Sequence, residues 1–381
     1  MQKRDSFLPT ENVMDQFHDI RPYNDDEVVG VLNNLVDTPD FINTIIDFRF
    51  AGWPKLLRAP LAFAVKIALK RQVSGINNVH DFQMRVAGYM ERMIKTTTSD
   101  VEYRGLEKLE KGVGYLFLSN HRDIAMDPAF VNYGLYLAEL NTVRIAIGDN
   151  LLRRPFVSDL MRLNKSFIVK RSVNGIREMM AAFAQLSGYI THSLTKDQCN
   201  IWIAQKEGRA KDGVDQTDPA LIKMLYMSQK KEKICFPEAM AKLKIVPVSI
   251  SYEYDPCAFD KARELYEKST TGNYEKTEFE DIDSIKNGIV GKKGKVVVTF
   301  GDILKDGIDT PEELVAAVDR QIITNYAIQG SNKAALAIEQ GLPSTDSAFA
   351  TYLESCPQDL RDTVIAMYAN PLKQQMKYLK K

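Results

Sequence analysis

The sequence predicts an α/β protein in which a mixed, largely buried sheet is flanked by helices, with helical additions at both ends. Short apolar runs that suit buried strands recur between about residues 100 and 300, where they alternate with segments of helical spacing. Up to about residue 98, and again from Thr310, the pattern is helical. We therefore expect a helical region at 1–98, an α/β domain at 99–309 and a helical region at 310–381.

The first region shows helix starts and helical spacing without obvious chemistry. Asp25 opens one candidate helix with acidic residues in its first turn, where they complement the helix dipole. A second candidate lies at 40–50, a third begins at Pro54 or Pro60, and a fourth lies at 79–94. These segments predict a helical N-terminal region.

The central region begins with a short strand and turn at 101–105 and continues with further strand candidates. These are apolar runs at 115–119, 143–147, 166–169, 200–204, 245–252 and 295–300. Helices are expected at 128–140 and 175–185. The segment 261–292 is rich in Lys, Glu, Asp and Gly, which predicts a helix and a surface excursion. Pro247 lacks a backbone N–H, so it indicates an edge strand or a bulge within its run.

The composition is that of an ordinary globular protein, and it argues against several classes. The 50 Lys and Arg residues balance the 50 Asp and Glu residues, so no global charge favours nucleic acid. The four cysteines lie far apart and the chain has four histidines, so neither a disulfide framework nor a metal site is expected. This cysteine usage fits a reducing, cytoplasmic setting.

Neither a signal segment nor a membrane-spanning helix is expected. The N-terminal sequence is polar and lacks an apolar signal core. The most apolar long stretch, 56–69, contains Arg58, Pro60 and Lys66 and is shorter than the roughly 20 residues needed to cross a bilayer. We expect a soluble protein, or one attached peripherally to the inner face of the cytoplasmic membrane.

The residues that follow the strand candidate at 115–119 carry the strongest chemical signal. His121 comes directly after the strand, and Asp123 and Asp127 follow within six residues. Open α/β sheets bind ligands at the carboxyl ends of their strands, and a nearby carboxylate holds an imidazole in one tautomer. These residues leave two interpretations open. One is a general base with a carboxylate partner, and the other is a loop histidine followed by Asp127 as the N-cap of a helix beginning at Pro128.

Three further blocks follow in order along the chain. Residues 165–171 form an apolar strand that ends in basic residues, 207–211 read Glu-Gly with basic residues after it, and 245–250 form an apolar strand containing a proline. With the Asn-His and Asp-Pro pairs at 120–128, these blocks resemble the glycerolipid acyltransferase superfamily, which includes glycerol-3-phosphate, lysophosphatidate and dihydroxyacetone-phosphate acyltransferases. The strand at 295–301 is similar to the closing strand of that family. The resemblance covers roughly the middle half of the chain.

The sequence departs from the family pattern in two places. Five residues separate the Asn-His pair from the Asp-Pro pair, where the family has four, and the block at 207–211 is one residue shorter. The resemblance implies that His121 is the general base. Asp127, in register with Pro128, is then its orienting partner, and Asp123, which is nearer in sequence, is the alternative.

The resemblance also implies a set of binding residues for an anionic acceptor. Arginine suits phosphate because its planar guanidinium donates two parallel hydrogen bonds. Glycine allows close approach of the backbone, and the glutamate is expected to orient its loop. The expected binding residues are Lys170, Arg171, Glu207, Gly208, Arg209 and Lys211.

The implied enzyme is an O-acyltransferase of phospholipid biosynthesis. It would move a fatty acyl group from acyl-CoA or acyl carrier protein to a hydroxyl of a phosphorylated precursor, either glycerol-3-phosphate-like or lysophosphatidate-like. This reaction needs no metal and no cofactor besides the donor substrate. Two alternatives are a thioesterase or other hydrolase, although no Gly-x-Ser-x-Gly elbow surrounds Ser119, and a catalytically degenerate peripheral lipid-binding protein.

Overall fold

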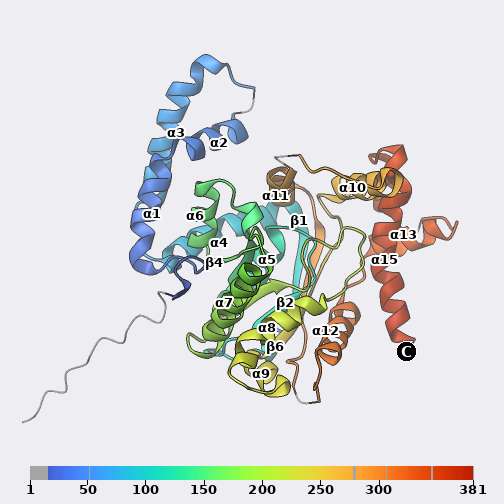
Figure 1. Cartoon of the computed structure of the whole chain (residues 1–381). Helices are drawn as coiled ribbons and strands as arrows, with labels where there is room; N and C mark the ends of the chain where they lie inside the picture. The colour runs from blue at the N-terminus through green and yellow to red at the C-terminus, as the bar shows by residue number, and fades with distance from the viewer. Residues whose placement is uncertain (1–15, 51, 278–279, 306, 345, 381) are drawn as a thin grey trace, which may run out of the picture. The chain divides into compact units, whose positions relative to one another are not determined.

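The computed structural model describes residues 16–50, 52–277, 280–305, 307–344 and 346–380, which fall into two compact units (Figure 1). The smaller unit combines the described residues of Met1–Val79 with Ile147–Tyr189, and the larger combines those of His80–Ala146 and Ile190–Lys381. Residues 1–15 of the expected N-terminal region, 278–279 of the polar segment and Lys381 lie outside the described residues. The division of the chain at residues 98 and 309 stays a prediction.

The larger unit is built on a mixed sheet, which confirms the predicted fold class. Within this unit the strands follow the order β1-β7-β6-β2-β5-β3. Their bounds are β1 (Thr98–Arg104), β2 (Leu116–Ser119), β3 (Arg144–Gly148, whose end belongs to the smaller unit), β5 (Ile201–Ala204), β6 (Ile245–Tyr252) and β7 (Gly294–Phe300). β6 and β7 are antiparallel, whereas the other neighbours are parallel.

β2 lies in the interior of this sheet, between β6 and β5. Every residue of β2 and of β6 is buried. Because side chains alternate along a strand, Phe117 points to one face, where it joins a core cluster with Val246, Val298 and Phe130 of α5 (Met126–Leu137). Packing on both faces fixes the end of β2, and therefore the start of the loop that carries His121.

The expectation that Pro247 marks an edge or a bulge is wrong. β6 pairs with β2 on one side and with β7 on the other, without a register shift in either pairing. Pro247 lies opposite Leu118, and its carbonyl accepts a hydrogen bond from the N–H of Gly301 at 2.8 Å. A proline fits here because β7 ends at Phe300, so that side needs no further donor from β6.

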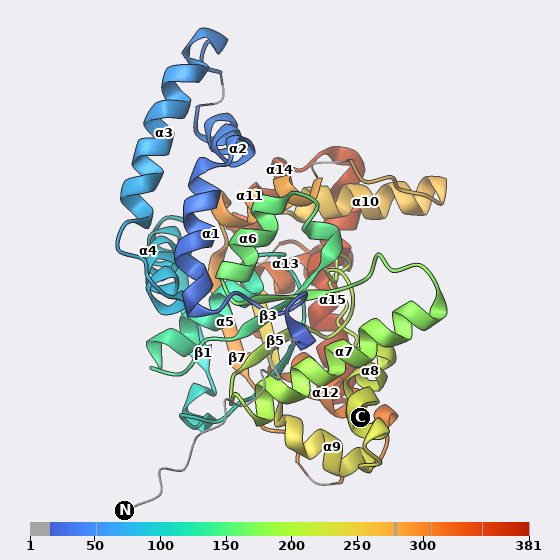
Figure 2. The same cartoon turned by 60° about the vertical axis from the view of Figure 1, so that its left-hand side comes forward.

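Helices surround this sheet, as Figure 2 shows from a second direction. They are α4 (Val79–Thr97), α5, α8 (Pro219–Lys231), α9 (Phe236–Leu243), α10 (Ala258–Thr271), α11 (Glu280–Val290), α12 (Pro311–Asn325), α13 (Gly330–Glu339), α14 (Ser347–Glu354) and α15 (Arg361–Leu379). The sequence reading missed α8 and α9. Asp218 caps α8 by accepting a hydrogen bond from the N–H of Ala220 at 2.8 Å, and Pro219 occupies the first helical position.

The polar segment that was expected to be one helix and a surface excursion instead forms α10 and α11. Lys261 and Glu264 of α10 are buried. The Lys261 ammonium donates to the carbonyl oxygen of Arg122 at 2.6 Å, and Glu264 forms an ion pair with Lys211. Two of the charged residues of this segment thus contact the loops at the carboxyl ends of the strands.

The smaller unit contains α1 (Asp25–Asp37), α2 (Pro39–Arg49), α3 (Arg58–Val73), α6 (Pro155–Leu163), β4 (Ser166–Val169) and the first part of α7 (Ile176–Thr195). Pro60 lies in the first turn of α3, and α6 was missed in the sequence. Ile42 and Ile46 of α2 pack with Val65 of α3 in a small core cluster. In the described part of the chain, no helix is both long and apolar enough to cross a membrane.

Candidate active site

His121 lies immediately after β2, at the carboxyl end of an interior strand. Its side chain is 14% exposed, and its ring meets the ring of Trp202 of β5 edge to face, with the centroids 5.6 Å apart. Its backbone carbonyl accepts a hydrogen bond from the N–H of Ala210 at 2.8 Å. The imidazole is thus held between two neighbouring strands, at the edge where open α/β sheets place their ligands.

Asp127 binds the imidazole of His121 through its carboxylate. The Nδ1 atom of His121 lies 2.8 Å from Oδ2 of Asp127, whose side chain is fully buried. The same oxygen accepts hydrogen bonds from the backbone N–H groups of Arg122 at 2.6 Å and Asp123 at 2.9 Å. Oδ1 accepts from the hydroxyl of Tyr252 at 2.7 Å. An ionised carboxylate only accepts hydrogen bonds, so in this contact Nδ1 is the donor of a neutral imidazole and Nε2 keeps its lone pair.

The alternative interpretation of Asp127 as an N-cap is wrong, because α5 begins at Met126, two residues before Pro128. Its N-cap is Ala125, and Asp127 lies in the first turn. Asp123 serves the helix start instead, since its Oδ1 accepts from the N–H groups of Ala125 at 3.0 Å and Met126 at 2.8 Å. The five-residue spacing therefore contains a turn that Asp123 closes, and Asp127 is the carboxylate beside His121.

Asp123 is buried, and its second oxygen has no hydrogen-bond partner among the described residues. Burial raises the pKa of Asp123, and the neighbouring charge of Asp127 raises it further. The hydroxyl of Tyr252 shows the same environment, because burial and the charge of Asp127 hold its pKa well above 10. Tyr252 therefore stays a protonated donor to Asp127. This role could not be predicted from the sequence, because Tyr252 lies 125 residues beyond Asp127.

The loop from Glu207 to Lys211 lies beside the loop that carries His121, to which the hydrogen bond of Ala210 joins it. Glu207 is exposed, and Gly208 has a φ of +76° that favours glycine. Nη2 of Arg209 donates to Oγ of Ser284 at 3.3 Å, whereas its Nη1 is buried without a partner among the described residues. Burial lowers the pKa of Lys211, which is paired with Glu264 of α10.

The two remaining predicted binding residues belong to the smaller unit. Lys170 forms an ion pair with Asp19, and its ammonium donates to Gln185 at 3.3 Å. The backbone N–H of Arg171 donates to Asp149 at 3.1 Å. Their role toward the acceptor stays a prediction.

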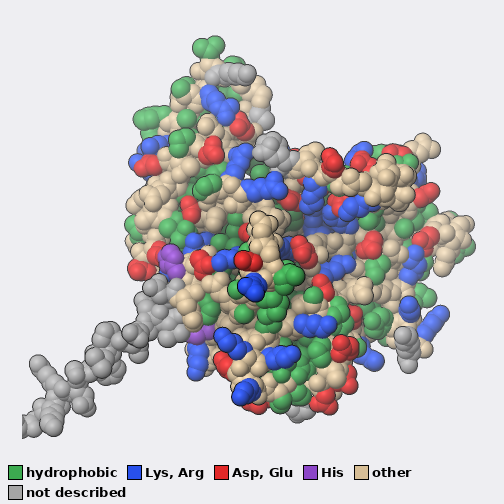
Figure 3. All heavy atoms as spheres, viewed as in Figure 1, with side chains coloured by type: hydrophobic (Ala, Val, Ile, Leu, Met, Phe, Trp, Pro, Cys, Tyr) green, Lys and Arg blue, Asp and Glu red, His purple; other side chains and the backbone are tan. Residues whose placement is uncertain are grey.

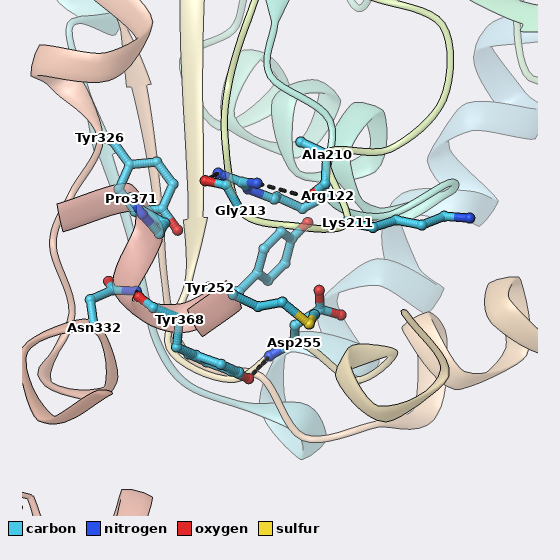
Figure 4. A pocket seen from close by; sticks show the side chains of 11 residues that line it. Arg122, Ala210, Lys211, Gly213, Tyr252, Asp255, Tyr326, Asn332, Tyr368 and Pro371 are labelled. Atoms are coloured by element: carbon cyan, nitrogen blue, oxygen red, sulfur yellow. Dashed lines mark hydrogen bonds between the residues drawn. The ribbon is translucent and has the colours of Figure 1, made fainter. Parts of the chain in front are cut away.

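Beside the catalytic loop the larger unit is hollowed, as Figure 4 shows. The hollow measures about 410 Å³, counted with the solvent at its mouth. Arg122, Tyr252 and Lys211 line it from the sheet side, and Tyr326 and Tyr368 line it from the C-terminal segments. Among the described residues, no group of His, Cys, Asp and Glu side chains could hold a metal ion.

A histidine with a buried carboxylate partner, at the carboxyl end of an interior strand, is the arrangement expected of an enzyme that uses a general base for group transfer or hydrolysis. The comparison with protein families narrows this class. Residues 100–251 match the family model described as Acyltransferase, a stretch that holds the four blocks. This region therefore resembles the acyltransferase family predicted from the blocks, and the match supports an acyltransferase activity.

A solved structure gives a more distant likeness. It is the crystal structure of the 1-acyl-sn-glycerophosphate (LPA) acyltransferase PlsC from Thermotoga maritima, with 15% sequence identity and a TM-score of 0.34. The match covers 77% of this chain and 92% of that chain. No curated protein matches the sequence significantly.

Proposed function

We propose that the protein transfers a fatty acyl group from acyl-CoA or acyl carrier protein to a hydroxyl of a phosphorylated glycerolipid precursor. The observation that carries this proposal is the 2.8 Å contact between Nδ1 of His121 and the buried carboxylate of Asp127. This contact leaves Nε2 as the base in a domain of the acyltransferase family. No cofactor besides the donor substrate enters the proposed reaction.

In the proposed reaction, Nε2 of His121 takes the proton of the acceptor hydroxyl while the oxygen attacks the thioester carbonyl. A C–O bond forms, the C–S bond breaks, and the departing thiolate takes up the proton from the imidazolium. Asp127 holds the ring and stabilises its protonated form. Direct transfer needs no acyl-enzyme, because positioning and a general base account for the chemistry.

The acceptor is proposed to be anionic because its expected contacts are cations. Arg209 supports this, since its Nη1 is buried without a partner among the described residues, and a buried charged donor is stabilised by an anion. Lys and Arg side chains gather near α10 and α11 on the face seen in Figure 3. Arg209→Ala, Lys211→Ala and Arg171→Ala should each raise the KM for a phosphorylated acceptor. Unchanged kinetics in the three variants would point to an uncharged acceptor.

The test of the base is His121→Ala, assayed with a labelled acyl thioester and each candidate acceptor. The turnover should fall by roughly two to four orders of magnitude, because the general base is lost. His80→Ala serves as the matched control, since His80 is exposed at the start of α4. Near wild-type turnover in folded His121→Ala would refute the mechanism.

The same assay separates the two alternatives. A thioesterase would release free fatty acid at the same rate with and without acceptor. A degenerate lipid-binding protein would consume no thioester under either condition. Acyl transfer that depends on acceptor excludes both, and the identity of the acylated product names the acceptor.

We further propose peripheral attachment to a lipid surface through the smaller unit and the C-terminal lysines. Within 53–69 several apolar side chains are exposed, among them Leu56 at 92% and Phe63 at 69%. Basic residues near an anionic surface contribute about 1 kcal/mol each. Lys373 contributes less than its sequence suggested, because it is paired with Glu339 at 2.8 Å.

Co-sedimentation with vesicles tests this attachment. Binding should be stronger to anionic than to neutral vesicles and should fall as salt is raised. Leu56→Ser with Phe63→Ser should weaken binding to both, whereas Leu342→Ser, an exposed leucine of the larger unit, should not. If the wild-type protein stays in the supernatant with both vesicles at low salt, attachment is refuted.

A further inference from the structure

A third carboxylate, that of Asp215, contacts the loop that carries His121. The residues on either side of His121 both bind it through their side chains. Nδ2 of Asn120 donates to Oδ2 of Asp215 at 3.2 Å, and Nη2 of Arg122 donates to the same oxygen at 2.7 Å. The side chains of Arg122 and Asp215 are 7% and 3% exposed. A single buried carboxylate oxygen thus holds both neighbours of the base.

Arg122 also binds the loop that carries Arg209. Nη1 of Arg122 donates to the carbonyl of Ala210 at 3.0 Å, and Nη2 of Arg122 donates to the carbonyl of Gly213 at 3.2 Å (Figure 4). In return, the N–H of Ala210 donates to the carbonyl of His121 at 2.8 Å. The loop of Arg209, whose Nη1 has no partner among the described residues, and the loop of His121 are therefore joined by hydrogen bonds in both directions.

Asp215 itself is fixed from the C-terminal side. Its backbone N–H donates to Oε1 of Gln374 in α15 at 3.0 Å, and its carbonyl accepts from Nε2 of the same side chain at 2.6 Å. Gly213 packs tightly against the same helix, because a Cβ at this position would lie 2.2 Å from the carbonyl oxygen of Met367. The carboxylate thus has a defined position that does not depend on His121.

A buried ion pair is a poor way to gain stability, since its desolvation offsets most of its attraction. Its geometry, however, is specific, because the planar guanidinium has to meet one carboxylate and two carbonyls at once. Such a pair is well suited to setting the position of a catalytic loop to within a fraction of an ångström, on which proximity effects depend.

We propose that Asp215 is a positioning residue for the acyl transfer, acting through Asn120 and Arg122 to hold His121 at a fixed distance from the loop of Arg209. The pair sets where the base meets the acceptor hydroxyl while the acceptor's anionic group is bound. This inference rests on the proposed function and adds to it a link between the base and the acceptor site.

The test is a kinetic comparison of Asp215→Asn and Arg122→Lys with the wild type, in the presence of acyl thioester and phosphorylated acceptor. A lysine at 122 keeps the charge, but one ammonium does not reproduce the bonds of the guanidinium to three oxygens. Both variants should lower kcat about 10- to 100-fold and raise the acceptor KM, while the donor KM stays within about twofold. The matched control is Asp197→Asn, which breaks the Arg144–Asp197 pair (2.6 Å) near the amino end of β3.

A second readout separates positioning from a loss of folded protein. Arg209→Ala should raise the acceptor KM less in the Asp215→Asn background than in the wild type, because the loop is no longer held. A reduced amount of folded enzyme would instead lower the apparent rate with both KM values and the Arg209 effect unchanged, and that result would overturn the proposal. So would wild-type kinetics in Asp215→Asn and Arg122→Lys. If the wild type itself transfers no acyl group, the proposed function fails and this inference fails with it.

Discussion

Replacing Tyr252 with Phe tests whether the hydrogen bond from the Tyr252 hydroxyl to the carboxylate of Asp127 contributes to the proposed catalysis. The hydroxyl is the partner that the described residues offer to Oδ1 of Asp127, at 2.7 Å, whereas Oδ2 keeps His121 and two backbone N–H groups. Phenylalanine keeps the ring, which packs edge to face against Phe130 with the centroids 5.9 Å apart. The substitution therefore removes one hydrogen bond and little packing.

The expected size follows from the strength of that bond. A hydrogen bond to a charged group contributes about 1.5–3 kcal/mol, and about 1.4 kcal/mol corresponds to a factor of ten in rate. If the loss falls on the protonated His121–Asp127 pair in the transition state, kcat should fall about 10- to 150-fold. The KM of the donor should change little, because Tyr252 acts through Asp127.

The assay is steady-state acyl transfer below the unfolding temperature, with circular dichroism to confirm the fold. Tyr254→Phe is the matched control two residues along, because its hydroxyl is buried without a hydrogen-bond partner among the described residues. Removing that hydroxyl should leave kcat unchanged and not lower the free energy of unfolding. A folded Tyr252→Phe enzyme with wild-type kcat would refute the assigned role of Tyr252.

Two other perturbations test neighbouring groups. Asp127→Asn should lower kcat at least tenfold more than Asp123→Asn. The amide nitrogen of the asparagine would face the backbone N–H groups that now donate to Oδ2 of Asp127. The opposite order of the two kcat values in kinetic assays would contradict the pairing of Asp127 with His121. Burial lowers the pKa of Lys293 to about 8, so between pH 8 and 10.5 the unfolded chain holds a proton that the folded protein has lost, and folding stability should rise with pH by up to about 1.4 kcal/mol per unit. Lys293→Met should flatten that rise in denaturant titrations at pH 7.5 and 9.5, and an unchanged slope would show that Lys293 is not the titrating group.

The interior strands β2, β5 and β6 could be predicted from the sequence because each is a buried apolar run. The run at 115–119 became β2 and the run at 245–252 became β6, nearly residue for residue. Helices that carry polar and apolar residues together were harder to predict from the sequence. The Asp-Pro pair at 218–219 was a usable signal for α8, whereas the charges of 261–292 were read as solvent-facing, although Lys261 and Glu264 bind buried loop atoms. Composition alone does not say whether a charge faces water or a carbonyl.

The residues of the candidate site divide in the same way. His121 and Asp127 are six positions apart, so a local motif predicts their pairing. The extra residue in this motif makes Asp123 an alternative partner in the sequence, and the turn at 123–126 in the structure excludes it. Tyr252 and Asp215 contact the same loop from 125 and 93 residues away. Such contacts depend on strand order, which a single sequence does not reveal.

The strand order also has a consequence for how the protein is made. β1 pairs with β7, whose residues emerge from the ribosome nearly 200 positions later, and β2 waits for β6 as a neighbour. Sequence-distant strand pairs close slowly, and chains that expose unpaired strand edges are prone to aggregate. A nascent chain that ends before residue 245 lacks β6, and with it Tyr252. It should therefore present an apolar, one-sided β2 to chaperones and should contain no supported His121–Asp127 pair until synthesis has passed β6.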